Sequence, residues 1–298
     1  MERRALGGTG LSVSVLGFGG AEIGYEGASL KTVEALLGGA LDAGLDVIDT
    51  AECYYESERL IGRAAGHRRR EFFLFTKCGH DQGIGLPEWT PRLVEASVER
   101  SLRLLRTDHL DLLQLHSCDE KVLRKGDLID ALERLRSSGK TRFIGYSGDS
   151  ADAVAAVRTG RFDVLQISIS VADQEVIELV LPEARAAGMG IVAKRPVANA
   201  AWRTGKRPAD AYHHTYWERL LKLDYPFLKR PLPEAVGTAL RFTLAVPGVA
   251  TAVVGTKTPG RWEANAALLA NGRLPPPEFE AIRARWRDVA RSGWAGQR

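Results

Sequence analysis

The chain has little cysteine, no long apolar run and no large excess of charge of one sign. Three cysteines in 298 residues are too few for a disulfide framework, and an odd count is typical of the reducing cytoplasm, where we expect this protein to reside. No stretch approaches the roughly 18 uninterrupted apolar residues of a membrane span, so we expect no membrane partner. Met1–Gly8 also lacks the apolar segment of a secretory signal.

Charge and composition exclude two further classes of protein. The 41 Lys and Arg residues nearly balance the 37 Asp and Glu residues, and only Arg68–Arg70 forms a basic cluster, so no nucleic-acid partner is expected. A hydrophobic fraction of 45% and a charged fraction of 26% are typical of a folded protein rather than a disordered one. The expected partner is therefore a small molecule, and the sequence carries no signal for an oligomeric state.

Eight short apolar runs alternate with eight amphipathic segments along the chain. The predicted strands are Val15–Phe18, Leu45–Ile48, Phe72–Phe75, Leu110–Leu115, Phe143–Tyr146, Val164–Ile169, Gly190–Ala193 and Thr251–Val254. The predicted helices are Leu30–Ala43, Ser57–Ala65, Pro91–Leu105, Leu128–Ser137, Ser150–Val157, Gln174–Ala187, Pro233–Leu244 and Pro259–Ala270. This alternation predicts parallel strands with right-handed crossovers, and eight such units predict a (β/α)8 TIM barrel.

The barrel is expected to be one domain over residues 1–298, with two additions. Residues 3–13 are predicted to form an N-terminal β-hairpin, and residues 277–292 an extra C-terminal helix. An open doubly wound sheet is the structural alternative. The segment Gly17–Gly20 is glycine-rich but lacks the third glycine that a Gly-x-Gly-x-x-Gly dinucleotide motif requires. This absence disfavours the doubly wound sheet.

The longest connection runs from Arg195 to Leu232 and is rich in aromatic residues. Long connections in compact domains are usually functional. We therefore expect this connection to line a substrate pocket together with the loops after the third and fourth strands; the alternative is that it simply packs on the barrel. The candidates for the pocket walls, drawn from several loops, are Tyr25, Tyr55, Trp89 and Trp202.

Polar residues follow three successive predicted strands. Asp49, Lys77 and His116 stand at or just after these strand ends, and Tyr54 follows Asp49 by five positions. Barrel enzymes carry their chemistry at this end of the strands. Asp49 and Lys77 come from neighbouring strands and are expected to pair, since buried charges are expensive when unpaired.

These four groups suit the protonation of a carbonyl oxygen. A nearby ammonium favours a tyrosine's phenolate, so we expect Lys77 to lower the pKa of Tyr54 from its usual value near 10. Such a phenol can donate a proton as hydride reaches the carbonyl carbon. The histidine can orient the carbonyl group.

The segment Asp49–Tyr54 resembles the Asp-Thr-Ala-x-x-Tyr signature of the aldo-keto reductases. The resemblance extends from about Arg4 to Ala267. It is also carried by Phe75–Lys77, Leu113–His116, Gly139–Ser147, Lys194–Pro196 and Val254–Pro259. It implies NADPH-dependent reduction of an aldehyde or ketone, with Tyr54 as general acid, Lys77 and Asp49 tuning it, and His116 positioning the carbonyl.

The same resemblance implies where NADPH or NADP+ binds. Ser147 and Gln166 are expected to hold the nicotinamide amide, and Lys194–Val197 to contact the pyrophosphate. Lys257 and Arg261 stand near a helix N-terminus, where positive charge is unfavourable unless an anion such as the 2′-phosphate binds there. The full set of expected contacts is Gly20, Asp49, Ser147, Gln166, Lys194, Arg195, Pro196, Val197, Gly255, Thr256, Lys257, Arg261 and Asn265.

Two other functions remain open from the residues. Cys53, Cys78, Cys118 and His80 form a Cys/His group that a metal-dependent barrel hydrolase would use, although no His-x-His follows the first strand and no Cys-x-x-Cys pair occurs. The expectation is therefore that the site holds no metal. A cofactor-binding sensor or subunit with little turnover is the other alternative, and the intact set of Asp49, Tyr54, Lys77 and His116 favours an enzyme over it.

Overall fold

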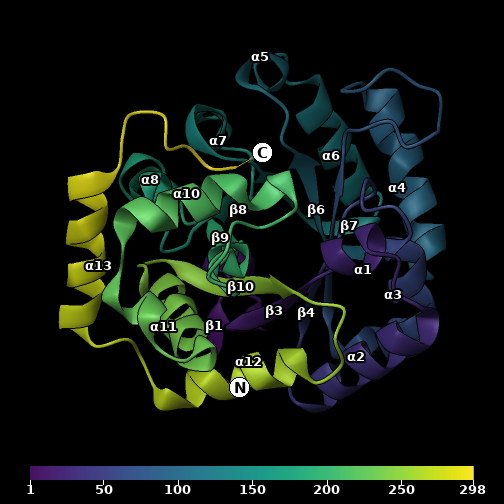
Figure 1. The fold of residues 1–298 in the computed structure, drawn as a ribbon. Coiled ribbons are helices and arrows are strands. Elements are labelled where there is room, and N and C mark those ends of the chain that lie inside the picture. The colour runs from purple at the N-terminus through teal and green to yellow at the C-terminus, as the bar shows by residue number, and fades with distance from the viewer. Residues whose placement is uncertain (298) are drawn as a thin grey trace.

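Eight parallel strands close into a barrel in the order β10-β3-β4-β5-β6-β7-β8-β9, with helices around it (Figure 1). The computed structural model describes residues 1–297. The strands are β3 (Leu16–Gly19), β4 (Val47–Asp49), β5 (Phe73–Cys78), β6 (Leu110–His116), β7 (Thr141–Ser147), β8 (Val164–Ser168), β9 (Gly190–Lys194) and β10 (Val249–Gly255). The predicted (β/α)8 barrel is confirmed.

Several strands continue past the apolar run that predicted them. β5 extends to Cys78, β6 to His116 and β7 to Ser147, because the backbone ladder persists where the side chains become polar. The pairs Cys78–Leu115 and His116–Ser147 show this continued register. The strand extensions carry polar side chains to one end of the barrel, which we call the mouth.

The helices surround the strands as the amphipathic pattern predicts. They are α1 (Ala21–Tyr25), α2 (Leu30–Asp42), α3 (Ser57–Ala65), α4 (Pro91–Leu105), α5 (Glu120–Leu123), α6 (Asp127–Ser137), α7 (Ser150–Arg158), α8 (Glu175–Leu179), α9 (Leu181–Ala186), α10 (His214–Leu223), α11 (Leu232–Ala245), α12 (Arg261–Leu268) and α13 (Pro276–Val289). α4 begins as expected: the Thr90 side chain accepts from the Leu93 N–H, and Pro91 occupies the first turn.

Three helical predictions need correction. The single helix expected over Gln174–Ala187 is two helices, α8 and α9, because Pro182 has no N–H to continue the ladder. The helix expected from Pro259 starts at Arg261, after the left-handed Gly260. α10 lies within the connection from Arg195 to Leu232, for which no helix was predicted.

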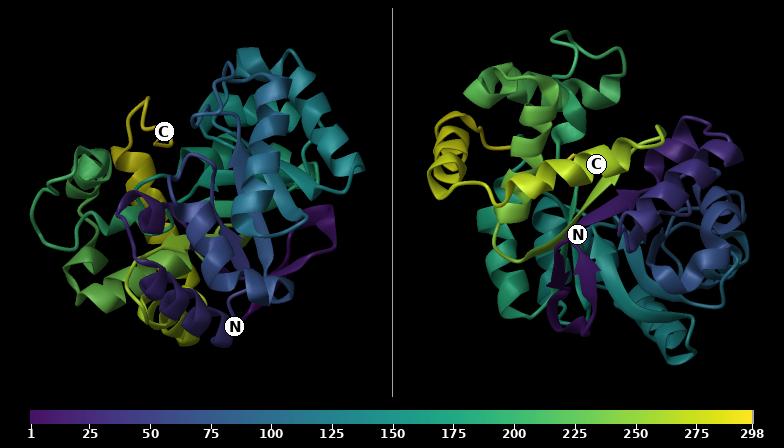
Figure 2. Two further views of the ribbon diagram at one scale, coloured as in Figure 1. Left: turned by 90° about the vertical axis from the view of Figure 1, so that its right-hand side faces the viewer. Right: turned by 90° about the horizontal axis from the view of Figure 1, so that it is seen from below.

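The N-terminal hairpin pairs β1 (Arg3–Ala5) with β2 (Ser12–Ser14) and covers the end of the barrel opposite the mouth, which we call the floor. Figure 2 shows the hairpin in purple beside the barrel strands. Gly7 at its tip has φ +55° and lies so close to the Gly190 backbone that a Cβ would clash. Hairpin and barrel side chains share one buried cluster: Leu6, Leu11, Val13, Val47, Phe75, Leu112, Val164, Val192, Ala250 and Val253.

The hairpin is also tied to the far end of the sequence. The Arg4 guanidinium donates to the Leu244 and Val249 carbonyls at 2.7 and 3.0 Å. α13, the predicted extra C-terminal helix, is confirmed and packs against α10.

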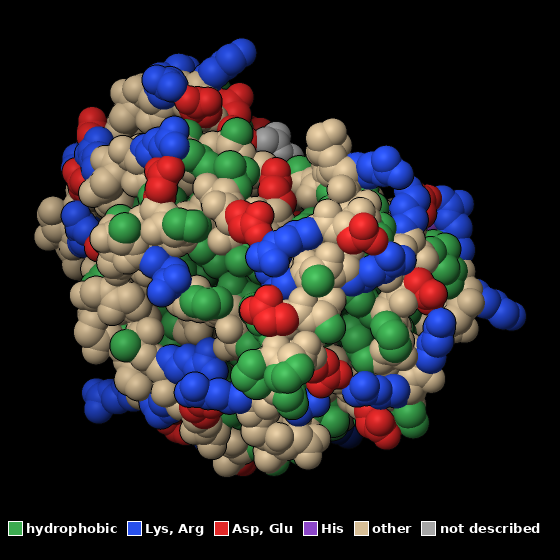
Figure 3. Space-filling view, turned by 90° about the vertical axis from the view of Figure 1, so that its left-hand side faces the viewer, with side chains coloured by type: hydrophobic (Ala, Val, Ile, Leu, Met, Phe, Trp, Pro, Cys, Tyr) green, Lys and Arg blue, Asp and Glu red, His purple; other side chains and the backbone are tan. Residues whose placement is uncertain are grey.

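Charged side chains of both signs are interspersed over the face that carries α13 (Figure 3). Within residues 1–297, none of the helices combines the length and the apolar character needed to cross a membrane.

Candidate active site

Asp49 and Lys77 form a buried ion pair at the mouth. Asp49 ends β4, Lys77 lies on neighbouring β5, and Lys77 Nζ is 2.8 Å from Asp49 Oδ2. Lys77 Nζ also donates to the Thr50 carbonyl at 2.7 Å, and Gln114 Nε2 donates to Asp49 Oδ1 at 3.4 Å. The expected pairing is confirmed, and these contacts fix the ammonium in one position.

Tyr54 and His116 complete the predicted set of four residues. Lys77 Nζ lies 5.1 Å from the centre of the Tyr54 ring. At this distance a cation interacts favourably with an aromatic ring. The Tyr54 and His116 ring centres are 5.8 Å apart and nearly perpendicular. Residues from β4, β5, β6 and the loop after β4 therefore meet at one place.

The Tyr54 phenol does not titrate as the sequence predicts. Burial raises the pKa of Tyr54 well above 10, and the neighbouring Asp49 carboxylate raises it further. The prediction of a lowered pKa is wrong because desolvation and Asp49 outweigh the Lys77 ammonium, whose charge Asp49 already compensates. The phenol is therefore protonated at neutral pH.

The His116 imidazole is neutral at physiological pH. Burial lowers its pKa well below 6.5, and the positive charges of Lys77 and Lys194 act in the same direction. The Cys53 thiol is 3.3 Å from His116 Nδ1, and His80 Nε2 lies 3.1 Å from the His116 carbonyl oxygen. His116 can therefore orient a substrate by hydrogen bonding rather than by charge.

Gln166 and Ser147 present unpaired polar groups beside these residues. They are register partners on β8 and β7, and both are buried. Gln166 Nε2, Gln166 Oε1 and Ser147 Oγ have no hydrogen-bond partner within residues 1–297. A buried amide normally finds partners, because leaving it unsatisfied is unfavourable. A carboxamide such as that of nicotinamide offers the complementary donor and acceptor.

Lys194 ends β9 and Arg195 follows it, in the segment where the sequence predicts pyrophosphate contacts. Lys194 Nζ is 2.9 Å from Asp149 Oδ2, and burial lowers the Lys194 pKa. Arg195 donates to Ser168 Oγ at 2.8 Å and to the Tyr212 hydroxyl at 2.9 Å. Both cations are held at the mouth, although Asp149 compensates part of their charge.

Pro196 and Val197 continue this segment. The Pro196 carbonyl accepts from Thr243 Oγ1 at 2.9 Å, which fixes the backbone behind Arg195. Val197 is partly buried against the main core.

The predicted phosphate end of the cofactor site carries charges of both signs. Lys257 pairs with Glu26 at 2.6 Å, and the Glu22 carboxylate occupies the space that a side chain at Gly255 would fill. Arg261 begins α12, is exposed, and has no ion-pair partner in the part of the chain that the structure describes. Arg261 is therefore the cation available to an anionic ligand.

The remaining predicted cofactor contacts lie in these same segments. The Gly20 N–H donates to the Asp49 carbonyl at 2.8 Å, which places the start of α1 beside the ion pair. Thr256 Oγ1 accepts from the Thr258 N–H at 3.0 Å, and Asn265 lies partly buried on α12.

Of the four aromatic pocket candidates, Tyr25 and Tyr55 lie nearest Tyr54. The Tyr25 ring centre is 5.5 Å from Tyr54 and 5.1 Å from Tyr55, and Tyr25 and Tyr55 are 52% and 67% exposed. Trp89 packs on His80 at 4.7 Å, and His80 in turn contacts His116. Trp202 packs against the main core instead, with its indole Nε1 buried and without an acceptor within residues 1–297.

A model of the aldo/keto reductase family matches residues 15–287. The chain belongs to the aldo/keto reductase family. It is 28% identical to the L-galactose dehydrogenase of Arabidopsis thaliana over 90% of this chain and 88% of that protein. It is also 28% identical to a D-threo-aldose 1-dehydrogenase of Pseudomonas sp, over 89% of this chain and 92% of that protein.

Solved structures of the family show the same fold. An aldo-keto reductase from Bacillus halodurans, solved in its holo form, is 27% identical, with a TM-score of 0.81 over 96% of each chain. The fold of this chain is therefore one that is known in this family.

Sequence reasoning missed several residues at the mouth of this aldo/keto reductase. Asp149 and Tyr212 restrain the two cations after β9, and Gln114 supports Asp49. The signal for Asp149 was a carboxylate two positions beyond the end of β7. Tyr212 gave no signal, because its approach to Arg195 depends on the path of a long connection.

The segment after α13 also reaches the mouth, which the sequence did not predict. Arg219 donates to the Ala295 carbonyl at 2.8 Å, and its guanidinium lies 5.3 Å from the Trp294 ring centre. Gly296 lies so close to Asp149 that a Cβ would be 2.3 Å from the carboxyl carbon.

The Cys/His group considered for a metal does not converge. Cys78 and Cys118 are buried, and Cys53 faces His116. Among residues 1–297, no cluster of three or more His, Cys, Asp or Glu side chains has the arrangement needed for a metal ion.

Proposed function

We propose that this aldo/keto reductase uses a nicotinamide dinucleotide, with NADPH preferred, to reduce an aldehyde or ketone to an alcohol. The observation that carries the proposal is the convergence of Asp49, Lys77, Tyr54 and His116 at one mouth. The unpaired Gln166 amide and Ser147 hydroxyl lie at the same end and fit a carboxamide.

The chain's own residues account for the proton in this reaction. Tyr54, protonated because of its raised pKa, donates its phenolic proton to the carbonyl oxygen. The Lys77 ammonium, held by Asp49 and the Thr50 carbonyl, favours the phenolate that forms as the proton leaves. His116 donates a hydrogen bond to the same oxygen. The dinucleotide, when bound, supplies hydride to the carbonyl carbon.

Cofactor preference rests on Arg261. NADPH differs from NADH by a 2′-phosphate, which a guanidinium can bind through two charge-assisted hydrogen bonds. Arg261 has no competing ion pair within residues 1–297, whereas Lys257 is paired with Glu26. We expect Arg261→Ala to weaken NADPH binding about 10- to 100-fold and to leave NADH binding nearly unchanged.

Fluorescence titration of both cofactors checks this preference, with Lys257→Ala as the matched comparison. We expect Lys257→Ala to have the smaller effect, because Glu26 already neutralises Lys257. Equal wild-type affinities for NADPH and NADH, or equal losses of affinity for both cofactors in Arg261→Ala, would show that Arg261 does not recognise the 2′-phosphate.

An NADPH-oxidation screen over aldehydes, ketones and quinones tests the reaction itself. The panel also includes aldoses in the oxidative direction with NADP+, since two similar proteins are named as dehydrogenases of an aldose and of L-galactose. The exposed Tyr25 and Tyr55 rings near Tyr54 offer apolar faces on which a sugar ring could stack. Turnover that Tyr54→Phe abolishes supports the proposal, whereas tight NADPH binding without turnover indicates a sensor.

We also propose that residues 1–298 act as a single domain in the cytoplasm. The bonds from Arg4 to Leu244 and Val249 support one cooperative unit, because they join the N-terminal hairpin to the last barrel strand and the helix before it. Three cysteines present as free thiols support a reducing compartment.

A further inference from the structure

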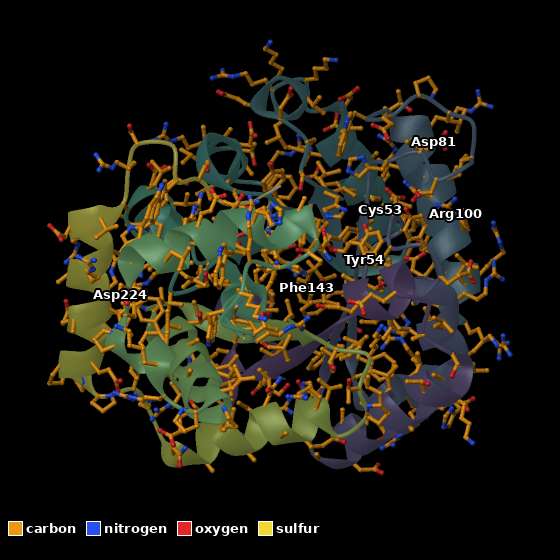
Figure 4. The ribbon with its side chains drawn as sticks, viewed as in Figure 1. Cys53, Tyr54, Asp81, Arg100, Phe143 and Asp224 are labelled. Atoms are coloured by element: carbon orange, nitrogen blue, oxygen red, sulfur yellow. The ribbon has the colours of Figure 1, made fainter. Side chains whose placement is uncertain are left out.

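The Cys53 thiol lies directly against the ring of His116. Cys53 precedes Tyr54 in the loop after β4, and Figure 4 labels both Cys53 and Tyr54. The contact joins Cys53 Sγ to His116 Nδ1 at 3.3 Å. The loop is held in place, since the Tyr25 hydroxyl donates to the Cys53 carbonyl at 3.2 Å.

The protonation states of the two groups determine which one donates. Burial raises the pKa of Cys53 to about 11, so the thiol keeps its proton at neutral pH. The His116 ring is neutral, because burial lowers its pKa, and so carries a proton on only one nitrogen. An imidazole nitrogen is a good acceptor and a thiol sulfur a poor one, which favours the S–H donating to Nδ1.

We propose that Cys53 is a positioning residue that holds His116 in the tautomer with its proton on Nε2. The inference rests on the proposed function, because it assigns the Nε2–H as the group that binds the substrate carbonyl oxygen. His80 does not compete for Nδ1, since its Nε2 contacts the His116 backbone carbonyl. The hydrogen bond made by one imidazole nitrogen thus determines whether the other nitrogen presents a proton or a lone pair.

The tautomer matters because the two forms have opposite effects on the carbonyl. With the proton on Nε2, the ring donates to the carbonyl oxygen and favours the negative charge that develops there as hydride arrives. With the proton on Nδ1, a lone pair would face that oxygen and repel it. Losing the thiol should therefore lower kcat more than it raises KM, by about 3- to 10-fold, the size of one hydrogen bond.

Nitrogen-15 NMR of the histidine-labelled apoprotein tests the tautomer without any substrate. The His116 signals are assigned by their loss in His116→Asn. In the wild type we expect a protonated Nε2 and an unprotonated Nδ1 across neutral pH. In Cys53→Ala we expect the Nδ1–H form to become populated, whereas Cys53→Ser, which retains a donor, should restore the wild-type pattern.

Cys118→Ala is the matched control, because Cys118 is a buried cysteine two positions from His116, and within residues 1–297 the thiol bonded to the His116 ring is that of Cys53. It should leave the tautomer unchanged. A protonated Nδ1 in the wild type, or identical spectra for wild type and Cys53→Ala, would overturn the inference. The spectra are independent of turnover, so a failed substrate screen would count against the proposed function and leave this result standing.

Discussion

The floor and the mouth of the barrel are made from the same eight strands but differ in the polarity of their buried side chains. The floor cluster of hairpin and strand residues is apolar, including Leu6, Val13 and Phe75. At the mouth the buried side chains are charged or polar, as with Asp49, Lys77 and Gln166. A cavity of about 490 Å³ near Arg4 lies on the floor side, away from the polar strand ends.

Backbone conformation differs in the same way. Arg195, Ala198 and Ala200, in the loop after β9 at the mouth, have positive φ values of 46–55° without being glycine. Such conformations are unfavourable for residues with a Cβ and persist only where the surroundings impose them. Together with the unpaired Gln166 amide, these conformations make the mouth energetically less favourable than the apolar floor.

The largest effect should come from the mouth. We expect Tyr54→Phe to lower kcat about 10²- to 10⁴-fold, because it removes the proton donor and keeps the ring that contacts Lys77. Urea unfolding and the NADPH dissociation constant should change little. Steady-state kinetics would disprove the role if the variant kept the wild-type kcat.

A floor substitution should produce the reverse pattern. Leu6 is 1% exposed in the floor cluster, so Leu6→Ala should lower the free energy of unfolding by about 2–5 kcal/mol. Cofactor affinity and kcat of the folded protein should remain at wild-type values. Leu221→Ala, at a side chain that is 58% exposed, is the control and should change stability by less than about 0.5 kcal/mol. A loss of cofactor affinity in Leu6→Ala would show that floor and mouth are not independent.

Part of the pH dependence of stability should trace to Glu52, a buried carboxyl near the mouth, and the buried Asp173, whose pKa is raised to about 7, adds to it. Burial raises the pKa of Glu52 from 4.5 to about 8, although its Oε1 accepts from the His80 N–H at 2.7 Å. Between these values the folded state binds a proton that the unfolded state has lost. Raising the pH from 5 to 8 should therefore lower the free energy of unfolding, on the order of 2–4 kcal/mol from this group.

Urea titrations at several pH values measure this slope. Glu52→Gln should make the slope smaller, because an amide replaces the protonated carboxyl, while Asp173 still titrates. Glu234→Gln, at an exposed position on α11, should leave the slope unchanged. A slope in Glu52→Gln equal to that of the wild type would assign the effect to other groups.

The smallest expected effect is a gain of stability, and it tests directly whether an unpaired polar group destabilises the mouth. Gln166→Leu removes a buried amide without partners and keeps a similar volume, so we expect it to raise the free energy of unfolding by about 1–2 kcal/mol. The same variant should bind NADPH about 10-fold more weakly, because the carboxamide loses its partner. Chemical denaturation and cofactor titration measure the two changes. A loss of stability would mean that the amide already has a partner in the folded protein.

The fold could be predicted because each strand contains a short, mainly apolar run, and these runs alternate with amphipathic segments along the chain. The Asp49–Lys77 pair could also be predicted, since neighbouring strands in a barrel bring their ends together. The sequence motif added Tyr54 and His116, and the structure places both beside Lys77.

Other features depend on three-dimensional packing that no local pattern encodes. The raised pKa of Tyr54 follows from the depth of its burial beside Asp49, and the sign of that shift could not be deduced from residue spacing. The pairing of Arg195 with Tyr212 requires the path of a long connection. The approach of Glu22 on α1 to Gly255 at the end of β10 joins two elements that are far apart in sequence.

The closing seam of the barrel has a consequence for how the protein is made. β3 pairs with β10, and Arg4 bonds to Val249, which is 245 positions further along the chain. A ribosome must therefore synthesise most of the polypeptide before the first barrel strand can gain its second neighbour. Until then β3 presents a free edge, which is the kind of surface that aggregates or recruits chaperones. We expect this barrel to close only after β10 has emerged from the ribosome, rather than early in synthesis.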